Sequence, residues 1–111
     1  MRMLFLGLVF LGGQLIAMQS RPVIHLQPHK NTIEVGFGGS LVELINAPAV
    51  IYLPPSPPET DAQGKPWSVD VKNLGPVSVM VTSIKSHFQT VVGTGQTARI
   101  ASNSISYLLK R

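Results

Sequence analysis

Beyond its first twenty residues the chain consists of short apolar runs separated by turn-forming residues, and this pattern limits its fold more than any other feature. No stretch from residue 21 onward keeps apolar residues at the three-and-four spacing of an amphipathic helix for three turns. Short apolar runs bounded by Gly, Pro, Asn or Ser are instead typical of β-strands. The sequence therefore predicts an all-β fold of about seven to nine short strands, as a small sandwich or a fibre-type β module.

The expected strands are Val23–Leu26, Thr32–Phe37, Leu41–Ile45, Ala49–Leu53, Trp67–Lys72, Val77–Ser83, Phe88–Val92, Thr97–Ala101 and Ile105–Leu109. Between them, the glycine turns GFGGS (36–40) and GTGQ (93–96) can supply the positive φ angles that tight turns require. Neither turn completes the spacing of a phosphate-binding loop, so no nucleotide site is expected. The segments that begin at Ile33 and Gln89 share an order of strand, turn and strand, which is a weak indication of two similar sub-units.

Residues 1–20 have the order of a secretory signal peptide. The segment MRMLFLGLVFLGGQLIAMQS begins with a positive charge at Arg2, continues through an apolar run and ends in small and polar residues. Its apolar part is interrupted by a Gly-Gly pair and is shorter than the roughly 20 apolar residues that span a bilayer. The sequence predicts cleavage between Met18 and Arg21. The alternative is an uncleaved hydrophobic leader that inserts into a membrane or packs on partner chains.

The remaining residues, 21–111, have the length of one domain. The formal net charge of the chain is +4, but its positive residues are spread along the sequence, which argues against a nucleic-acid interface. There is no cysteine, which excludes disulfides and thiolate metal sites. An exported location, periplasmic or extracellular, stays open because oxidising compartments permit disulfides without requiring them.

The longest break in the strand pattern is PPSPPETDAQGKP, at residues 54–66. Proline fixes φ and has no backbone N–H donor, so this segment is not expected to form a central strand. We interpret it as an extended crossing at one end of the β structure. Its overlapping P-x-x-P patterns leave open a docking motif for an aromatic groove.

The segment WSVDVK directly after this crossing alternates between apolar and polar residues. Trp67, Val69 and Val71 fall on one face of a strand, and this pattern predicts that Trp67 is a core residue. An exposed platform for stacking a ligand is the alternative for Trp67. The same alternation over residues 77–81, after the NLGP turn, predicts that the two strands pair as a hairpin.

The histidines do not form a clear metal site. His25 and His29 are four residues apart, but Pro28 lies between them and no third ligand is evident nearby. His87 has no assignable partner. We therefore expect no metal or cofactor site.

The acidic and serine residues also give no catalytic pattern. Glu34 and Glu43 flank a glycine turn and could face each other, whereas Glu59 and Asp61 lie in the polar loop, where solvation is the simplest explanation. No G-x-S-x-G motif presents a serine nucleophile. The sequence thus predicts a protein that is not an enzyme, with no catalytic residue assigned.

The run from Val50 to Arg111 contains VIYLPPS, GKPWSVDVKNLGP, VSVMVTS, GTGQTARIASN and SYLLK, in that order. This order resembles a β module of bacteriophage tail fibres, appendages and other virion proteins. The resemblance implies a non-enzymatic structural or host-contact module, often trimeric. The expected partners are then further copies of the chain, another protein or a surface glycan, and the protein would be virion-associated or exported. The alternative is a secreted or periplasmic β-sandwich that binds a ligand as a monomer.

Overall fold

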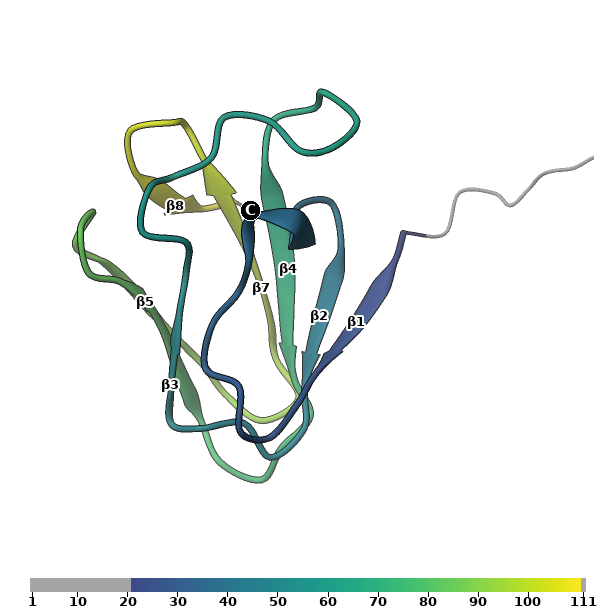
Figure 1. Cartoon of the computed structure of the whole chain (residues 1–111). Helices are drawn as coiled ribbons and strands as arrows, with labels where there is room; N and C mark the ends of the chain where they lie inside the picture. Colours follow the sequence, from purple (N-terminus) through teal and green to yellow (C-terminus); the bar gives the residue numbers. More distant parts are fainter. Residues whose placement is uncertain (1–20, 111) are drawn as a thin grey trace, which may run out of the picture.

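Within residues 21–110 the chain forms eight strands in two sheets that enclose an apolar core (Figure 1). The structure is a computed structural model, and these are the residues that it describes. The predicted leader at residues 1–20 and its cleavage site lie outside this range. The all-β prediction is confirmed, and the two packed sheets make the fold sandwich-like. Nowhere in residues 21–110 is there a helix with the length and apolarity to cross a bilayer.

The larger sheet has five strands, in the order β1, β2, β4, β7, β8. Their bounds are β1 Val23–Leu26, β2 Leu41–Leu44, β4 Ser68–Asn73, β7 Thr97–Ser102 and β8 Tyr107–Leu109. β1, β2 and β4 run parallel to one another, β7 is antiparallel to β4, and β8 is antiparallel to β7. Parallel neighbouring strands need a crossover connection. Between β2 and β4 this connection includes β3, which belongs to the other sheet.

The smaller sheet has three strands, in the order β3, β5, β6. Their bounds are β3 Val50–Tyr52, β5 Val79–Ser83 and β6 Phe88–Val92. β3 is parallel to β5, and β6 is antiparallel to β5. The predicted bounds of β1 and β6 are confirmed to the residue, and those of the other strands that form differ by one or two residues at an end.

The core lies between the sheets and takes alternate residues from their strands, as the pleat of a strand requires. The buried side chains include Val42, Val71 and Ile100 of the larger sheet and Val81 of the smaller one. Trp67, directly before β4, is fully buried, with a relative exposure of 0%. The prediction of a core tryptophan is therefore confirmed, and an exposed stacking platform is excluded.

The expected hairpin between the strands at 67–72 and 77–83 is wrong. β4 pairs with β2 and β7, whereas β5 pairs with β3 and β6 in the other sheet. The buried side chain of Asn73 holds the turn between them: its Nδ2 donates to the carbonyls of Val77 (2.7 Å) and Val92 (3.0 Å), and its Oδ1 accepts from Gly75 N at 2.9 Å. These bonds carry the chain across to the second sheet instead of back along β4.

The strand expected at Thr32–Phe37 is also wrong. Only Thr32 forms an isolated bridge, with Tyr52, and the chain then makes a 3₁₀ turn, η1, at Val35–Phe37. The turn aims the carbonyl of Val35 at Trp67, whose Nε1 donates to it at 2.8 Å. A Cβ at Gly38 would lie 2.5 Å from the Trp67 ring, so a glycine is needed where the turn passes this side chain. Tertiary contact with Trp67 thus overrides the local alternation.

The proline-rich segment 54–66 leads from β3 in the smaller sheet to β4 in the larger one. Its carbonyls accept hydrogen bonds from the other half of the chain: Tyr107 Oη donates to Pro54 O at 2.6 Å, and Ser102 Oγ donates to Pro58 O. The segment is therefore pinned to β7 and β8. The strands before it already lie in both sheets, so the two suggested sub-units do not form.

Candidate functional site

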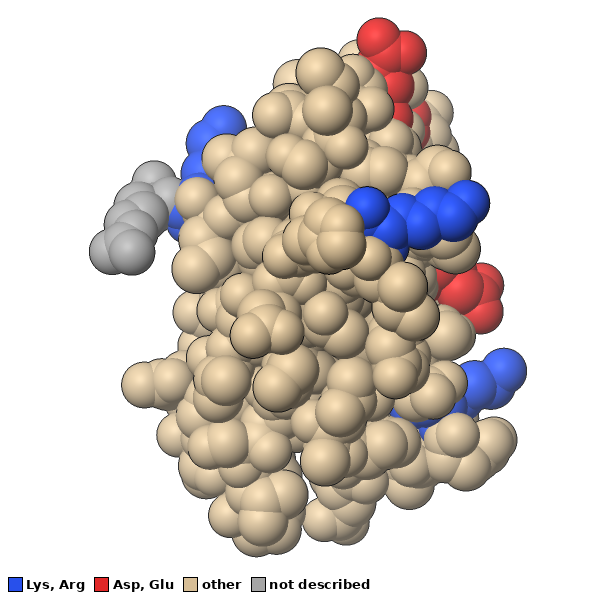
Figure 2. All heavy atoms as spheres, turned by 90° about the vertical axis from the view of Figure 1, so that its left-hand side faces the viewer, with Lys and Arg blue, Asp and Glu red and all other residues tan. Residues whose placement is uncertain are grey.

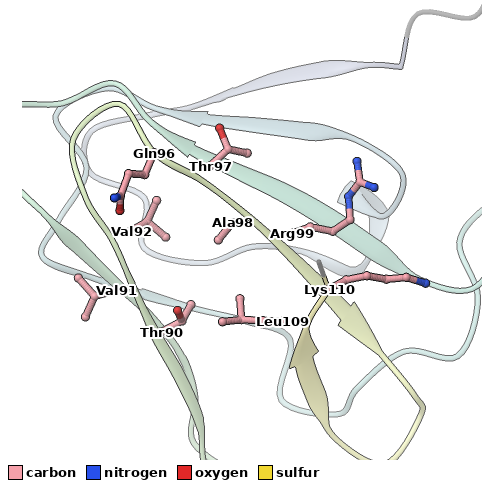
Figure 3. A pocket seen from close by; sticks show the side chains of 9 residues that line it. All are labelled: Thr90, Val91, Val92, Gln96, Thr97, Ala98, Arg99, Leu109 and Lys110. Atoms are coloured by element: carbon pink, nitrogen blue, oxygen red, sulfur yellow. The ribbon is translucent and has the colours of Figure 1, made fainter.

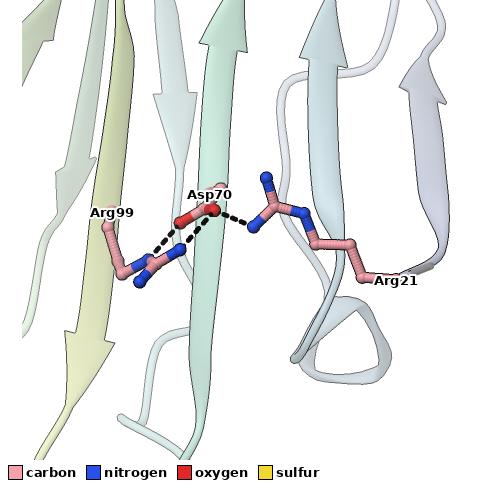
Figure 4. Close-up of polar contacts among 3 residues, drawn as sticks. All are labelled: Arg21, Asp70 and Arg99. Carbon is pink, nitrogen blue, oxygen red and sulfur yellow. Dashed lines mark hydrogen bonds and ion pairs between the residues drawn. The ribbon is translucent and has the colours of Figure 1, made fainter. Parts of the chain in front are cut away.

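The outer face of the larger sheet carries charged side chains that pair with one another. Asp70 of β4 lies between Arg21 and Arg99 (Figure 4). Arg99 Nε donates to Asp70 Oδ1 at 2.7 Å and Arg99 Nη2 donates to Oδ2 at 3.0 Å, while Arg21 Nη1 donates to Oδ2. The Asp70 side chain is only 6% exposed, and both guanidinium groups reach it from the solvent side.

These contacts set the ionisation of the cluster. The hydrogen bonds from Arg99 hold the pKa of Asp70 below its ordinary value, because they outweigh burial, which acts in the opposite direction, and Arg21 adds to the lowering. The same contact raises the pKa of Arg99. Every charge in the cluster has a partner within it, so we assign it a structural role in joining β4, β7 and the start of β1.

Sequence reasoning placed Asp70 on the polar face of a strand but did not find its partners. Arg99 is 29 residues away and Arg21 is 49 residues away. The signal that could have found Arg99 is the strand register, since Asp70 and Arg99 are directly opposite each other in the antiparallel pair of β4 and β7. That register depends on a sheet order that local patterns do not reveal.

His25 and Glu43 lie on the same outer face, whereas His29 and His87 lie in turns. His25 Nε2 is 2.9 Å from Glu43 Oε1, across the parallel pair of β1 and β2. Glu43 therefore contacts His25, while Glu34 lies at the start of η1. No group of three or more His, Asp or Glu side chains within residues 21–110 could hold a metal ion.

The remaining polar candidates have local roles in the fold. Asp61 Oδ1 accepts from the backbone N–H groups of Gln63 (2.8 Å) and Lys65 (3.1 Å), and these bonds shape the polar loop. Burial raises the pKa of Tyr107 to about 12, and its hydroxyl bonds to the proline-rich segment. Glu59 lies in the same loop and is exposed, as expected.

The outer face of the smaller sheet differs, because it carries no charged side chain on its strands. The residues that alternate with the buried ones on this face are Val50, Tyr52, Met80, Thr82, Gln89 and Val91. Val91 is 61% exposed. Figure 2 looks at the side of the molecule on which β3 and β5 lie, and this surface consists mostly of uncharged residues.

A cleft of about 450 Å³ lies where β6 of the smaller sheet borders β7 and the end of β8 of the larger one (Figure 3). Across it Thr90 faces Leu109. Val92 faces Ala98 deeper in the same cleft. Neither the sequence patterns nor the turn motifs indicated this cleft, because its two walls belong to different sheets.

In comparisons with known proteins, no family model, no curated protein and no solved structure gives a significant match to the chain. The resemblance of residues 50–111 to phage virion modules therefore stays a prediction. The candidate site is therefore defined by the structure alone: it consists of the uncharged outer face of the smaller sheet and the open cleft beside β6.

Proposed function

We propose that this chain is a non-enzymatic contact module, a structural or surface-binding protein that works by association with other macromolecules. The observation that supports it is the uncharged outer face of the smaller sheet. Sheet faces exposed to water usually carry polar and charged residues, and an exposed face without charges is typical of an association surface. On the outer face of the larger sheet, in contrast, Asp70 pairs with Arg21 and Arg99, and Glu43 contacts His25.

The resemblance to virion modules favours one version of this proposal. In that version, copies of the chain associate with one another, often as trimers. The protein would then be virion-associated, or exported by the leader. Contact with a host protein or surface glycan is the further role that the resemblance suggests.

The mass of the full-length protein in solution tests this form of the proposal. We expect a mass that is a multiple of the chain mass in analytical ultracentrifugation, and we expect Val91→Lys to reduce it, because a lysine at this position places a charge on the association surface. Val23→Lys is the matched control: it makes the same change at a valine that is 52% exposed on the outer face of the larger sheet. A monomer at every concentration, or equal loss in both variants, would contradict self-association through this face.

The second candidate function is a secreted or periplasmic ligand-binding sandwich, and the cleft at β6 favours it. Its volume of about 450 Å³ lies within the range of small-molecule sites. This candidate expects a monomer at every concentration, in the natural chain and in Val91→Lys alike, because the cleft is formed within a single chain (Figure 3). The mass measurement thus separates the two functions.

A further inference from the structure

The free edge of β6 distinguishes this strand from the other sheet edges. β6 forms an uninterrupted register of pairs with β5 over Phe88–Val92, and it is the last strand on that side of its sheet. No backbone hydrogen bond within residues 21–110 joins its other side to a neighbouring segment. Its sequence, FQTVV, has no charge and no proline. It therefore offers a row of unpaired backbone donors and acceptors.

The other three edges are protected in ways that are common in natural sheets. β3 is covered by the segment before η1: Ile33 N donates to Tyr52 O, and Tyr52 N donates to Asn31 O, both at 2.8 Å. β1 begins directly after a proline and carries a histidine that is paired with Glu43. β8 has only three residues and is followed by Lys110. Among the sheet edges formed within residues 21–110, β6 is the longest strand, and it carries no charge, proline or covering segment.

The cleft lies directly beside this free edge, and the side chains that face it are uncharged. Thr90 and Val92 of β6 point into it, opposite Leu109 and Ala98. The two cationic residues at its border are turned away: the guanidinium of Arg99 is held by Asp70 on the outer face, and the Lys110 side chain extends out of the cleft (Figure 3).

We propose that β6 and the adjoining cleft bind an extended polypeptide segment, which adds as a strand to β6 and places uncharged side chains in the cleft. An unpaired strand edge is complementary to another polypeptide backbone, and alternate side chains of an added strand point to one face. That face would be the cleft, where small apolar side chains can contact Thr90, Ala98 and Leu109. Basic side chains are disfavoured there, since Arg99 and Lys110 at the border of the cleft would repel a further positive charge.

This inference rests on the proposed contact function. It identifies an extended polypeptide segment as the partner of the free edge of β6. It differs from self-association, because the occupant is a single strand and not a second sheet. It also differs from small-ligand binding, because the backbone of the occupant supplies the hydrogen bonds. These differences decide the choice of probe.

The probe is a blocked pentapeptide of alternating threonine and valine, titrated into the full-length protein labelled with ¹⁵N. We expect saturable shifts of the backbone amides that are largest in Phe88–Val92. A peptide with proline at its centre removes a backbone donor, and a peptide with lysine in place of valine adds a positive charge beside Arg99 and Lys110, so both should bind more weakly by roughly tenfold or more. Absence of saturable binding, shifts centred elsewhere, or equal binding of the lysine peptide would overturn the proposal.

Variants of β6 provide the matched controls. Thr90→Lys places a charge in the cleft and should weaken binding of the threonine–valine peptide by roughly tenfold or more, whereas Gln89→Lys, on the opposite face of the same strand, should change it less than about threefold. Leu109→Lys, on the other wall, repeats the test if Thr90→Lys does not fold. A dimer that is lost in Thr90→Lys, without peptide binding, would overturn the proposal and assign the edge to a second copy. A monomer that binds the peptide would retain the inference while contradicting self-association.

Discussion

The two sheets of this protein use their outer faces differently. On the outer face of the larger sheet, Asp70 lies between two arginines and Glu43 contacts His25, so most charged groups there are paired, whereas Lys72 of β4 makes no ion pair within residues 21–110. On the smaller sheet the outward residues of the strands are uncharged, and the edge strand β6 has no backbone hydrogen bond on its outer side within residues 21–110. Groups that are paired internally indicate a structural role. Backbone groups without a hydrogen-bond partner and exposed uncharged side chains indicate where another molecule can bind.

The largest effect is expected at Trp67, in the core that both sheets share. The indole is fully buried, donates to Val35 O and packs edge-on against Tyr107, with ring centroids 6.0 Å apart. Trp67→Ala should lower the free energy of unfolding by about 3–5 kcal/mol in chemical denaturation. Val77→Ala, at a valine that is 58% exposed, is the control and should change it by less than about 0.5 kcal/mol. A Trp67→Ala protein of unchanged stability would break the picture of a core shared by both sheets.

A smaller loss is expected at Asp70. Asp70→Asn leaves two arginine side chains without their counter-charge, and it should lower the free energy of unfolding by about 1–2 kcal/mol, since both guanidinium groups remain partly solvated. Glu43→Gln removes a carboxylate of the same face whose histidine partner is largely exposed, and it should cost less than about 0.5 kcal/mol. Equal effects of the two changes would remove the structural distinction that we assign to the Asp70 cluster.

The pH dependence of stability provides an independent measure of the same cluster. The folded pKa of Asp70 lies below its ordinary value of 3.8, so the unfolded chain binds more protons than the folded one in this range. The contribution of Asp70 is therefore present above the unfolded pKa and is lost as the pH falls through the folded pKa. Denaturation curves at acidic pH should show a steeper loss of stability for the natural chain than for Asp70→Asn. Parallel pH profiles would contradict the assignment.

The smallest effect on stability is expected on the smaller sheet. Gln89→Lys introduces a charge on its outer face, where the side chain is exposed, and should change the free energy of unfolding by less than about 0.5 kcal/mol. Such a result would mean that folding does not require this face to be uncharged, which supports a role in association. A loss comparable to that of Asp70→Asn would instead make the uncharged face a requirement of the fold.

Local sequence patterns predicted the elements of this fold better than their partners. The alternation in WSVDVK placed Trp67, Val69 and Val71 on a buried face, and all three are buried. The same kind of alternation failed at Thr32–Phe37, because contact with Trp67 bends that segment into a turn. It also failed to predict pairing after β4, because the side chain of Asn73 makes long-range bonds that direct the chain to the other sheet.

The candidate site was even harder to predict from the sequence than the strand pairing. The sequence shows that β5 and β6 contain uncharged residues. Whether these residues face a partner, the core or water depends on which strands flank them. The cleft requires β6 to lie at one edge of its sheet and near the end of β8. Neither condition is encoded in the spacing of nearby residues.

By itself, the sequence determined that the chain is all-β, where most of its strands lie and that Trp67, Val69 and Val71 share a buried face, because alternation and turn chemistry act between residues that are close along the chain. Only the tertiary structure decided which strands pair, which charges meet and which edge stays open. These depend on contacts between segments that are tens of residues apart, such as Asp70 with Arg21 and Arg99. The free energy of such contacts is set by packing and register across the whole domain, which no short window of sequence contains.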